Sequence, residues 1–201
     1  MRHRPSLSPL KIPAFARLAG SYTVNELGDW LGSVALAILV FQETGDPLAL
    51  TALMLANKLV PAFVAPFVTA RLDQFATRRA LPGVYLGEAA AFGALAATVN
   101  DFSLALVLVL ALLDGTLALT GRALSRAAIA AALEPRRLLR EGNAIVNVGF
   151  AAAAAGGPAL GGVVVAGLGI STALALDAAS FALIAILLAA TRGLPDARPE
   201  P

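Results

Sequence analysis

The first long apolar stretch of the chain sets the expected fold, and it reads FARLAGSYTVNELGDWLGSVALAILVF over residues 15–41. An α-helix needs about 20 residues to cross roughly 30 Å of hydrocarbon, so this stretch is long enough to span a membrane. Its polar side chains include Tyr22, Asn25, Glu26, Asp29 and Ser33. Their spacing of i, i+3, i+4, i+7 and i+11 places them on one stripe of a helix. The stretch therefore predicts a spanning helix with a single polar face.

Five further apolar stretches follow, and turn-forming residues separate them. We expect spanning helices over residues 48–70, 82–99, 103–125, 143–168 and 171–190. Pro82 is expected to open the third helix, because a proline at the first helical position loses no hydrogen bond. The expected fold is an all-α membrane protein, with a six-helix transmembrane bundle over residues 15–190. A segment over residues 1–14 precedes the bundle, and a tail over residues 191–201 follows it.

These six stretches sort the basic residues almost entirely onto one side of the membrane. The residues on that side are Arg2, Arg4, Lys11, Arg17, Arg71, Arg78, Arg79, Arg122, Arg126, Arg136, Arg137, Arg140, Arg192 and Arg198. The three loops on the other side carry no Lys or Arg, and only Lys58 lies in mid-span. Cytoplasmic loops of membrane proteins carry an excess of Lys and Arg. We therefore expect a multi-pass protein of the cell (inner) membrane with both termini in the cytoplasm.

The composition agrees with a chain surrounded by lipid. Hydrophobic residues make up 58% of the 201 residues and charged residues 14%, whereas a soluble domain has about 25% charged residues. The mean hydropathy is +0.79. The formal net charge of +2 does not indicate nucleic-acid binding, because the basic residues lie in short loops beside apolar stretches.

Enzyme chemistry is not expected from this sequence. The chain has no Cys, and its one histidine, His3, lies in a polar terminal segment. The sequence shows no metal-ligand spacing, no phosphate-binding glycine loop and no Ser/His/Asp set. We therefore expect no catalytic residue, no cofactor and no metal.

Several charged residues are expected at bilayer depth, where each costs about 2.5–3.5 kcal/mol and usually faces protein or water. We interpret the polar stripe of the first helix as the wall of a substrate or proton pathway, with a buried structural face as the alternative. Lys58 is expected to pair with Glu26 or Asp29, either for structure or for transport. Arg122 is the better candidate for pairing with an acid inside the bundle, whereas Arg126 is close enough to the helix end to reach lipid head groups.

Three more acids lie singly in the later helices. They are Glu88, Asp114 and Asp177. We expect each to anchor one helix to another through a hydrogen bond rather than to contact a substrate.

A glycine-rich segment interrupts the fifth helix. Gly157 and Gly161 form a small-xxx-small pair, which lets another helix approach closely. Pro158 removes one helical hydrogen bond and is expected to bend the helix. Gly157, Pro158, Gly161 and Gly162 are compatible with two interpretations, tight helix packing and a flexible gating helix.

Six short motifs occur in order along the chain. They are NELGDWL (25–31), FQETGDPLAL (41–50), RLDQFATRR (71–79), LLREGNA (138–144), GPALGG (157–162) and LDAASF (176–181). Together they resemble the N-terminal half of a major facilitator superfamily transporter. The similar subfamily is that of bacterial drug and siderophore exporters, which includes enterobactin-exporter-like and transmembrane secretion effector proteins. The resemblance implies proton-coupled export of a small organic molecule by alternating access.

The resemblance also assigns roles at the inner ends of the helices. It places Asp73, Arg78 and Arg79 in the gating loop between the second and third helices of the superfamily. Arg126 is then the expected latch partner of Asp73. Gln74 stands where the family motif has Arg, so this latch is weakened here.

The superfamily builds its transporters from two six-helix halves, and this chain carries six spans. A second six-helix half or a homodimer is therefore expected as partner, besides the lipid bilayer, a small-molecule substrate and protons. The alternative is a non-transporting membrane scaffold, or the relic of a truncated twelve-span transporter. The charged stripe favours transport, because idle polar groups in lipid destabilise a fold.

Overall fold

Apolar helices make up nearly all of the chain, of which the computed structural model describes residues 7–191 and 193–195. The long helices are α1 (Pro13–Thr44), α4 (Thr77–Ala97), α5 (Leu104–Leu133), α6 (Leu139–Leu168) and α7 (Ile170–Ala190). The second span comprises α2 (Pro47–Met54), the π-helical segment η2 (Leu55–Leu59) and α3 (Val60–Leu72). The short 3-10 segments are η1 (Ser8–Lys11), η3 (Val99–Asp101) and η4 (Glu134–Arg136). The positions that lie outside the described residues include Arg2, His3, Arg4, Arg192 and Arg198.

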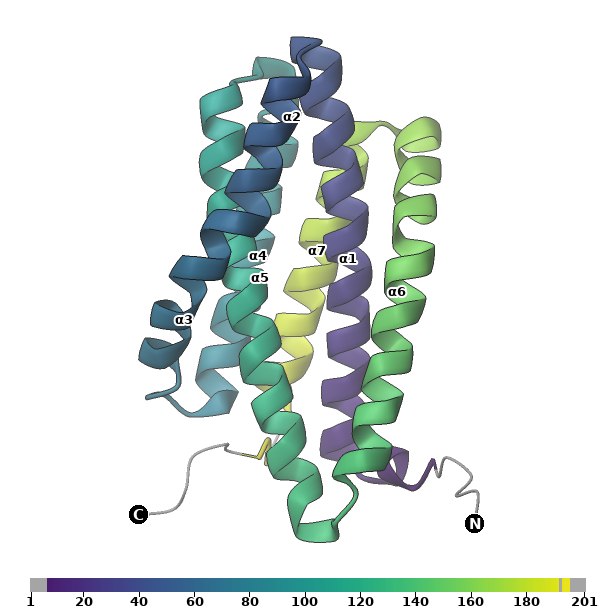
Figure 1. Cartoon of the computed structure of the whole chain (residues 1–201). Helices are drawn as coiled ribbons and strands as arrows, with labels where there is room; N and C mark the ends of the chain where they lie inside the picture. Colours follow the sequence, from purple (N-terminus) through teal and green to yellow (C-terminus); the bar gives the residue numbers. More distant parts are fainter. Residues whose placement is uncertain (1–6, 192, 196–201) are drawn as a thin grey trace.

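Within the described residues, six helices are long and apolar enough to cross a membrane, which confirms the predicted all-α membrane fold. Consecutive spans run in opposite directions, so α1 begins and α7 ends at the same end of the bundle (Figure 1). We call this the basic end. The described cations in its segments are Lys11, Arg17, Arg71, Arg78, Arg79, Arg136, Arg137 and Arg140. The turns at the opposite end, around residues 45–46, 98–103 and 169, carry no Lys or Arg.

The turn between α1 and α2 shows how short the connections at that opposite end are. Gly45 adopts a left-handed conformation with φ 61°, and its N–H donates to the carbonyl of Phe41. Asp46 then caps α2, because its Oδ1 accepts from the N–H of Leu48 at 2.8 Å. Two residues therefore suffice to reverse the chain and to place the first two spans side by side.

The third span begins earlier than the sequence predicted. α4 starts at Thr77, so Pro82 lies inside the helix, and Arg78 and Arg79 belong to its first turn. The prediction that Pro82 opens this helix was wrong. A proline near the start of a helix removes only one backbone hydrogen bond, and a charged first turn can extend beyond the apolar layer.

The fourth span also extends past its predicted end. α5 continues to Leu133 rather than ending near Ser125. Arg122 and Arg126 therefore lie within the helix instead of at its end. An Ala-rich run over residues 127–132 supports this extension, because alanine has the highest helix propensity.

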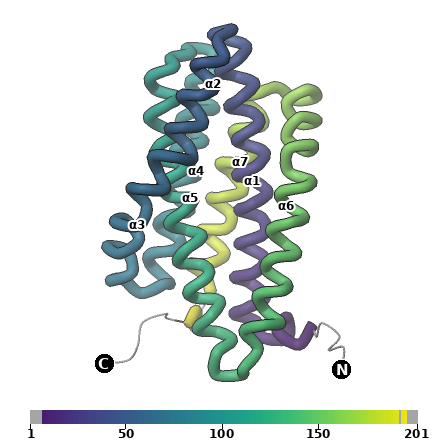
Figure 2. Tube along the Cα trace, viewed as in Figure 1, coloured from purple at the N-terminus to yellow at the C-terminus, as the bar shows by residue number. Residues whose placement is uncertain are grey.

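The core is organised around α1, which packs against α2, α5, α6 and α7, as the tube in Figure 2 illustrates. α4 packs mainly against α7 and α5. The rings of Phe92 on α4 and Phe181 on α7 lie 5.6 Å apart between centroids, and both side chains are buried. Gly32 of α1 lies directly against Phe92, where a side chain would collide with the ring. This close packing holds α1 between α7 and α6 and turns its polar stripe toward α5.

Two spans have fewer buried residues than the others. In the most apolar window of α6, 17% of residues are buried, and in that of the second span 28% are buried. The corresponding share is 50% for α1 and for α4. α6 and the second span therefore form the outer sides of the bundle.

Candidate functional site

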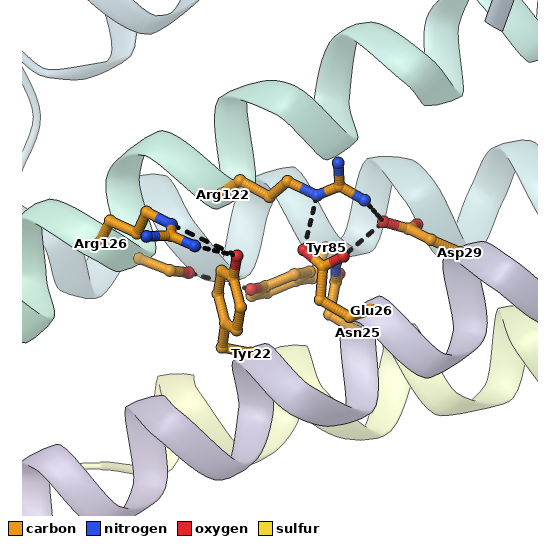
Figure 3. Close-up of polar contacts among 8 residues, drawn as sticks. Tyr22, Asn25, Glu26, Asp29, Tyr85, Arg122 and Arg126 are labelled. Atoms are coloured by element: carbon orange, nitrogen blue, oxygen red, sulfur yellow. Dashed lines mark hydrogen bonds and ion pairs between the residues drawn. The ribbon is translucent and has the colours of Figure 1, made fainter. Parts of the chain in front are cut away.

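The polar stripe of α1 faces the interior of the bundle. Tyr22, Asn25, Glu26 and Asp29 are at most 7% exposed, and they point toward α5 (Figure 3). Ser33, one turn further along α1, is half-buried. The single polar face predicted from the sequence is thus present in the folded chain, while its role as a pathway wall stays a prediction.

Arg122 of α5 contacts two carboxylates of this stripe. Its Nε lies 2.6 Å from Oε1 of Glu26, and its Nη2 donates a hydrogen bond of 2.9 Å to Oδ2 of Asp29. Nδ2 of Asn25 donates to the same Asp29 oxygen at 3.3 Å (Figure 3). The side chains of Glu26 and Asp29 are 0% and 6% exposed, and that of Arg122 is 27% exposed. One guanidinium is therefore shared by two buried acids on the neighbouring helix.

Arg126, one turn along α5, contacts Tyr22. Its Nη2 and Nε donate to the Tyr22 hydroxyl at 3.0 and 3.3 Å, and its Cζ lies 5.3 Å from the centre of the ring. This is the geometry of a cation–π contact combined with hydrogen bonds. Beside it, Tyr85 of α4 and Ser125 of α5 share a buried hydrogen bond of 3.1 Å. Tyr85 and Ser125 were not among the predicted site residues, although a tyrosine in an apolar helix indicates a buried hydroxyl that needs a partner.

The expected latch between Arg126 and Asp73 is not formed. Within the part of the chain that the structure describes, both ion pairs belong to Arg122. Asp73 follows the last residue of α3 and is exposed, as are Arg78 and Arg79 in the first turn of α4. The expectation was wrong because Arg126 lies opposite the polar stripe of α1, where the Tyr22 hydroxyl is within reach.

Lys58 does not pair with the α1 acids either. It is exposed on η2, and no ion pair joins it to Glu26 or Asp29. Its neighbour Asn57 is the residue that faces inward, with 5% exposure. Nδ2 of Asn57 donates to the carbonyl of Ala111 at 3.1 Å and to Oδ2 of Asp114 at 3.0 Å. The second span therefore contributes an amide, and not an ammonium group, to the interior.

Asn57 and not Lys58 faces inward because the buried positions Ala49, Leu53 and Asn57 recur every four residues along one face of the second span. Pro61 has no N–H, so the carbonyl of Asn57 loses its ordinary helical partner. The N–H of Val60 instead donates to the carbonyl of Leu55, which closes a wider turn. Gly115 of α5 lies directly against the freed Asn57 carbonyl, where any side chain would collide with it. The absence of a side chain at Gly115 lets the two helices meet at this point.

Three acids from different helices converge next to the ion pair. One carboxylate oxygen from each of Asp29, Glu88 and Asp114 lies within 4.8 Å of the other two, and all three side chains are buried. The hydrogen bond from Asn57 makes Asp114 an anchor between spans, as predicted. Glu88 is 0% exposed, and neither of its carboxylate oxygens has a hydrogen-bond partner, so the anchor role expected for it was wrong. Sequence spacing did not reveal this group, because its members lie on separate helices.

Asp177 lies apart from that group. Its side chain on α7 packs against Gly28 and Gly32 of α1, where neither glycine has a side chain to hold it away. Its Oδ1 accepts from Ser180 of the same helix at 3.5 Å, and its Oδ2 has no partner. The role of Asp177 as a hydrogen-bond anchor between helices was therefore also wrong.

The glycine-rich segment of α6 does not interrupt the helix, which runs from Leu139 to Leu168 with Pro158 inside it. Gly157 and Gly161 are buried against α1. A Cβ at Gly157 would lie 2.5 Å from Cβ of Trp30, and one at Gly161 would lie 3.1 Å from Cα of Leu31. The predicted close helix contact is thus present, whereas Gly162 faces open space. The bend at Pro158 and the gating role stay predictions.

The site contains more acid than base. The buried acids are Glu26, Asp29, Glu88, Asp114 and Asp177. Arg122 balances the charge of one of them, and ionised groups without compensation are expensive in a medium of low dielectric constant. Protons or bound cations therefore have to neutralise the remainder. A group of this kind is suited to taking up and releasing positive charge.

Comparison with known proteins places the chain in a family. A family model described as transmembrane secretion effector matches residues 4–200, nearly the whole chain. No significant match was found among curated proteins or among solved structures. The family is one of transporters rather than enzymes, and the six spans correspond to half of a major facilitator fold. With this match over almost its full length, the chain belongs to the transmembrane secretion effector family of membrane transport proteins.

Proposed function

We propose that this chain forms one half of an exporter that moves a small organic molecule out of the cell in exchange for protons. The observation that carries the proposal is the sharing of Arg122 between Glu26 and Asp29 at the contact of α1 with α5. Family membership supports the transport function. The choice of a drug or siderophore as substrate rests on the motif resemblance to drug and siderophore exporters.

Protonation offers a physical route from this ion pair to a change of shape. With both carboxylates ionised, Glu26, Asp29 and Arg122 together carry a net negative charge, and Arg122 is held between the two acids. A proton on Glu26 or Asp29 weakens the attraction of that acid for Arg122 and removes one buried charge. The two protonation states therefore favour different contacts between α1 and α5. Such a two-state contact is the element that alternating access requires.

The exposed sides of the bundle support a second half. Few residues in the apolar windows of α6 and of the second span are buried by the other helices. We propose that these sides pack against six further helices, contributed by the same polypeptide, by another chain or by a second copy. The basic end then lies in the cytoplasm and the bundle in the cell membrane, since cytoplasmic loops carry the excess of Lys and Arg.

Transport by everted membrane vesicles tests the proposal. Vesicles containing the protein and its second half are energised with a proton gradient, and uptake of the dye ethidium is followed by fluorescence. We expect uptake that nigericin abolishes, that Asp29→Asn or Arg122→Gln reduces to the level of empty vesicles, and that Glu43→Gln leaves unchanged. Glu43 is the matched control, because it is an exposed acid on the same helix.

Two results would count against the proposal. If neither ethidium nor a catechol siderophore is taken up, the chain is better described as a non-transporting scaffold. If uptake persists in Asp29→Asn and Arg122→Gln, the ion pair is not the coupling element.

A further inference from the structure

We propose that Asp29, Glu88 and Asp114 form a binding site for a hard divalent cation of about the size of Ca²⁺, enclosed between α1, α4 and α5. One oxygen from each carboxylate lies within 4.8 Å of the other two. Carboxylate oxygens are the preferred ligands of hard cations in proteins. The proposal concerns ion binding alone, so its failure would leave the proposed transport function in place.

The hydrogen bonds around the group point to a ligand beyond the protein itself. Glu88 is 0% exposed and aims at the other two acids, yet both of its carboxylate oxygens lack a hydrogen-bond partner. Oδ1 of Asp29 and Oδ1 of Asp114 are also buried without a partner. Buried polar atoms are almost always paired, so four unpaired oxygens on three neighbouring side chains need a common explanation. A cation between them provides it.

Neighbouring side chains hold two of the acids in the orientation that a metal site needs. Asp114 accepts from Asn57 through Oδ2, which leaves Oδ1 unpaired. Asp29 accepts from Arg122 and Asn25 through its own Oδ2 and likewise leaves Oδ1 unpaired. Each aspartate is thus fixed by one oxygen and offers the other. Supporting contacts of this kind orient the ligands of metal sites in general.

The kind of ligand favours Ca²⁺ over Mg²⁺. The oxygens of Asp29, Glu88 and Asp114 lie within 4.8 Å of one another, which either ion fits. Mg²⁺ loses its water reluctantly and usually keeps several waters, whereas Ca²⁺ is commonly held by several protein carboxylates in flexible geometry. A buried group of three carboxylates therefore suits Ca²⁺ better.

The charge of the surroundings favours a divalent ion. The five buried acids of the site carry five negative charges when all are ionised, and Arg122 supplies one positive charge in contact with two of them. A divalent cation then leaves two negative charges, whereas a monovalent cation leaves three. In a low-dielectric interior the smaller residual charge is the less costly arrangement.

Equilibrium binding of ⁴⁵Ca²⁺ to the purified protein in detergent tests the site. We expect saturable binding of one ion per chain, weakened by at least about 10-fold in Asn57→Ala and by more in Glu88→Gln and Asp114→Asn. Asp177→Asn is the matched control, because Asp177 is also buried and has an unpaired oxygen but lies outside the group. Its affinity for Ca²⁺ should fall by much less than that of Glu88→Gln, because Asp177 contributes nearby charge but no ligand oxygen.

Thermal melting separates loss of the site from loss of the fold. Ca²⁺ should raise the melting temperature of the native chain and of Asp177→Asn, because a ligand stabilises the state that binds it. At the same Ca²⁺ concentration, the rise should be smaller for Asn57→Ala and smallest for Glu88→Gln. Absence of saturable binding to the native chain would overturn the proposal. So would equal loss of affinity in Asp177→Asn and Glu88→Gln, or unchanged affinity in Glu88→Gln.

Discussion

Nη2 of Arg122 on α5 lies 2.9 Å from Oδ2 of Asp29 on α1, and this contact joins the two helices inside the bundle. Glu26, one turn earlier on α1, shares the same guanidinium. Both acids are buried, so without Arg122 their negative charges would lie uncompensated in a medium of low dielectric constant. Removing one partner of a buried ion pair lowers the stability more than replacing both partners with neutral residues, because the remaining charge is left buried without a partner.

Replacement of Arg122 should therefore be more damaging than removal of all three charges. We expect Arg122→Gln to lower the free energy of unfolding by about 3 kcal/mol. The triple variant Glu26→Gln/Asp29→Asn/Arg122→Gln should recover most of this loss. Denaturation in mixed micelles measures both, with Arg79→Gln as the control because Arg79 is exposed. Equal stability of Arg122→Gln and Arg79→Gln, or a triple variant less stable than Arg122→Gln, would show that Arg122 does not compensate the charges of Glu26 and Asp29.

The α1–α6 contact leads to a second prediction. A Cβ at Gly157 would lie 2.5 Å from Cβ of Trp30, whereas one at the adjacent Gly156 meets nothing within 4 Å. Gly157→Ala should thus destabilise the bundle by about 1–3 kcal/mol through overpacking. Gly156→Ala should leave stability unchanged or raise it slightly, because alanine is the better helix former. Melting temperatures in detergent measure the difference, and equal values for the two variants would contradict the packing described here.

The partner of Arg126 gives a third prediction. Double-mutant cycles measure the coupling of Arg126→Gln with Tyr22→Phe and with Asp73→Asn. The Tyr22 pair should show a coupling of about 0.5–1 kcal/mol, because a guanidinium against a ring and its hydroxyl is a favourable contact. The Asp73 pair should show none, because the two side chains form no ion pair. A larger coupling energy for the Asp73 pair than for the Tyr22 pair would indicate that the latch forms, and it would contradict the structure.

Much of the fold follows from periodicity and length in the sequence. Six apolar stretches predict six spans, and the spacing from Tyr22 to Asp29 predicts the buried stripe of α1. The ends of the helices were predicted less accurately, because apolar residues mark the part of a helix that lies in lipid, and a helix can continue beyond that part. α4 begins at Thr77 and α5 continues to Leu133, in each case beyond the apolar stretch.

The site depends on which face of each helix turns inward. Lys58 was expected to face the α1 acids, but Asn57 belongs to the four-residue series of buried positions with Ala49 and Leu53. That spacing was the signal available in the sequence that Lys58 faces outward. The convergence of Glu88 and Asp114 with Asp29 depends on how three helices pack, and no spacing within one helix contains that information.

Orientation in the membrane is a fourth prediction, and the absence of cysteine makes it simple to test. A single cysteine at Glu43 or Asp101, both exposed at the end opposite the basic end, should react with an impermeant maleimide added to intact cells. A cysteine at Phe75, which is exposed at the basic end, should react only after the membrane is permeabilised. Labelling of Phe75→Cys alone in intact cells would place the basic end outside.

The distance between α1 and α5 at two pH values shows whether protonation of Glu26 and Asp29 releases Arg122. Spin labels at Arg17→Cys and Glu134→Cys, both exposed, report the basic ends of these helices by pulsed electron paramagnetic resonance in nanodiscs. Acidification from about pH 8 to about pH 4 protonates carboxyl groups and should release Arg122. We predict that the distance distribution changes in the native chain. In Glu26→Gln/Asp29→Asn the distance distribution at both pH values should match the distribution of the native chain at low pH. An unchanged distribution in the native chain, or the same pH response in the double variant, would contradict the account.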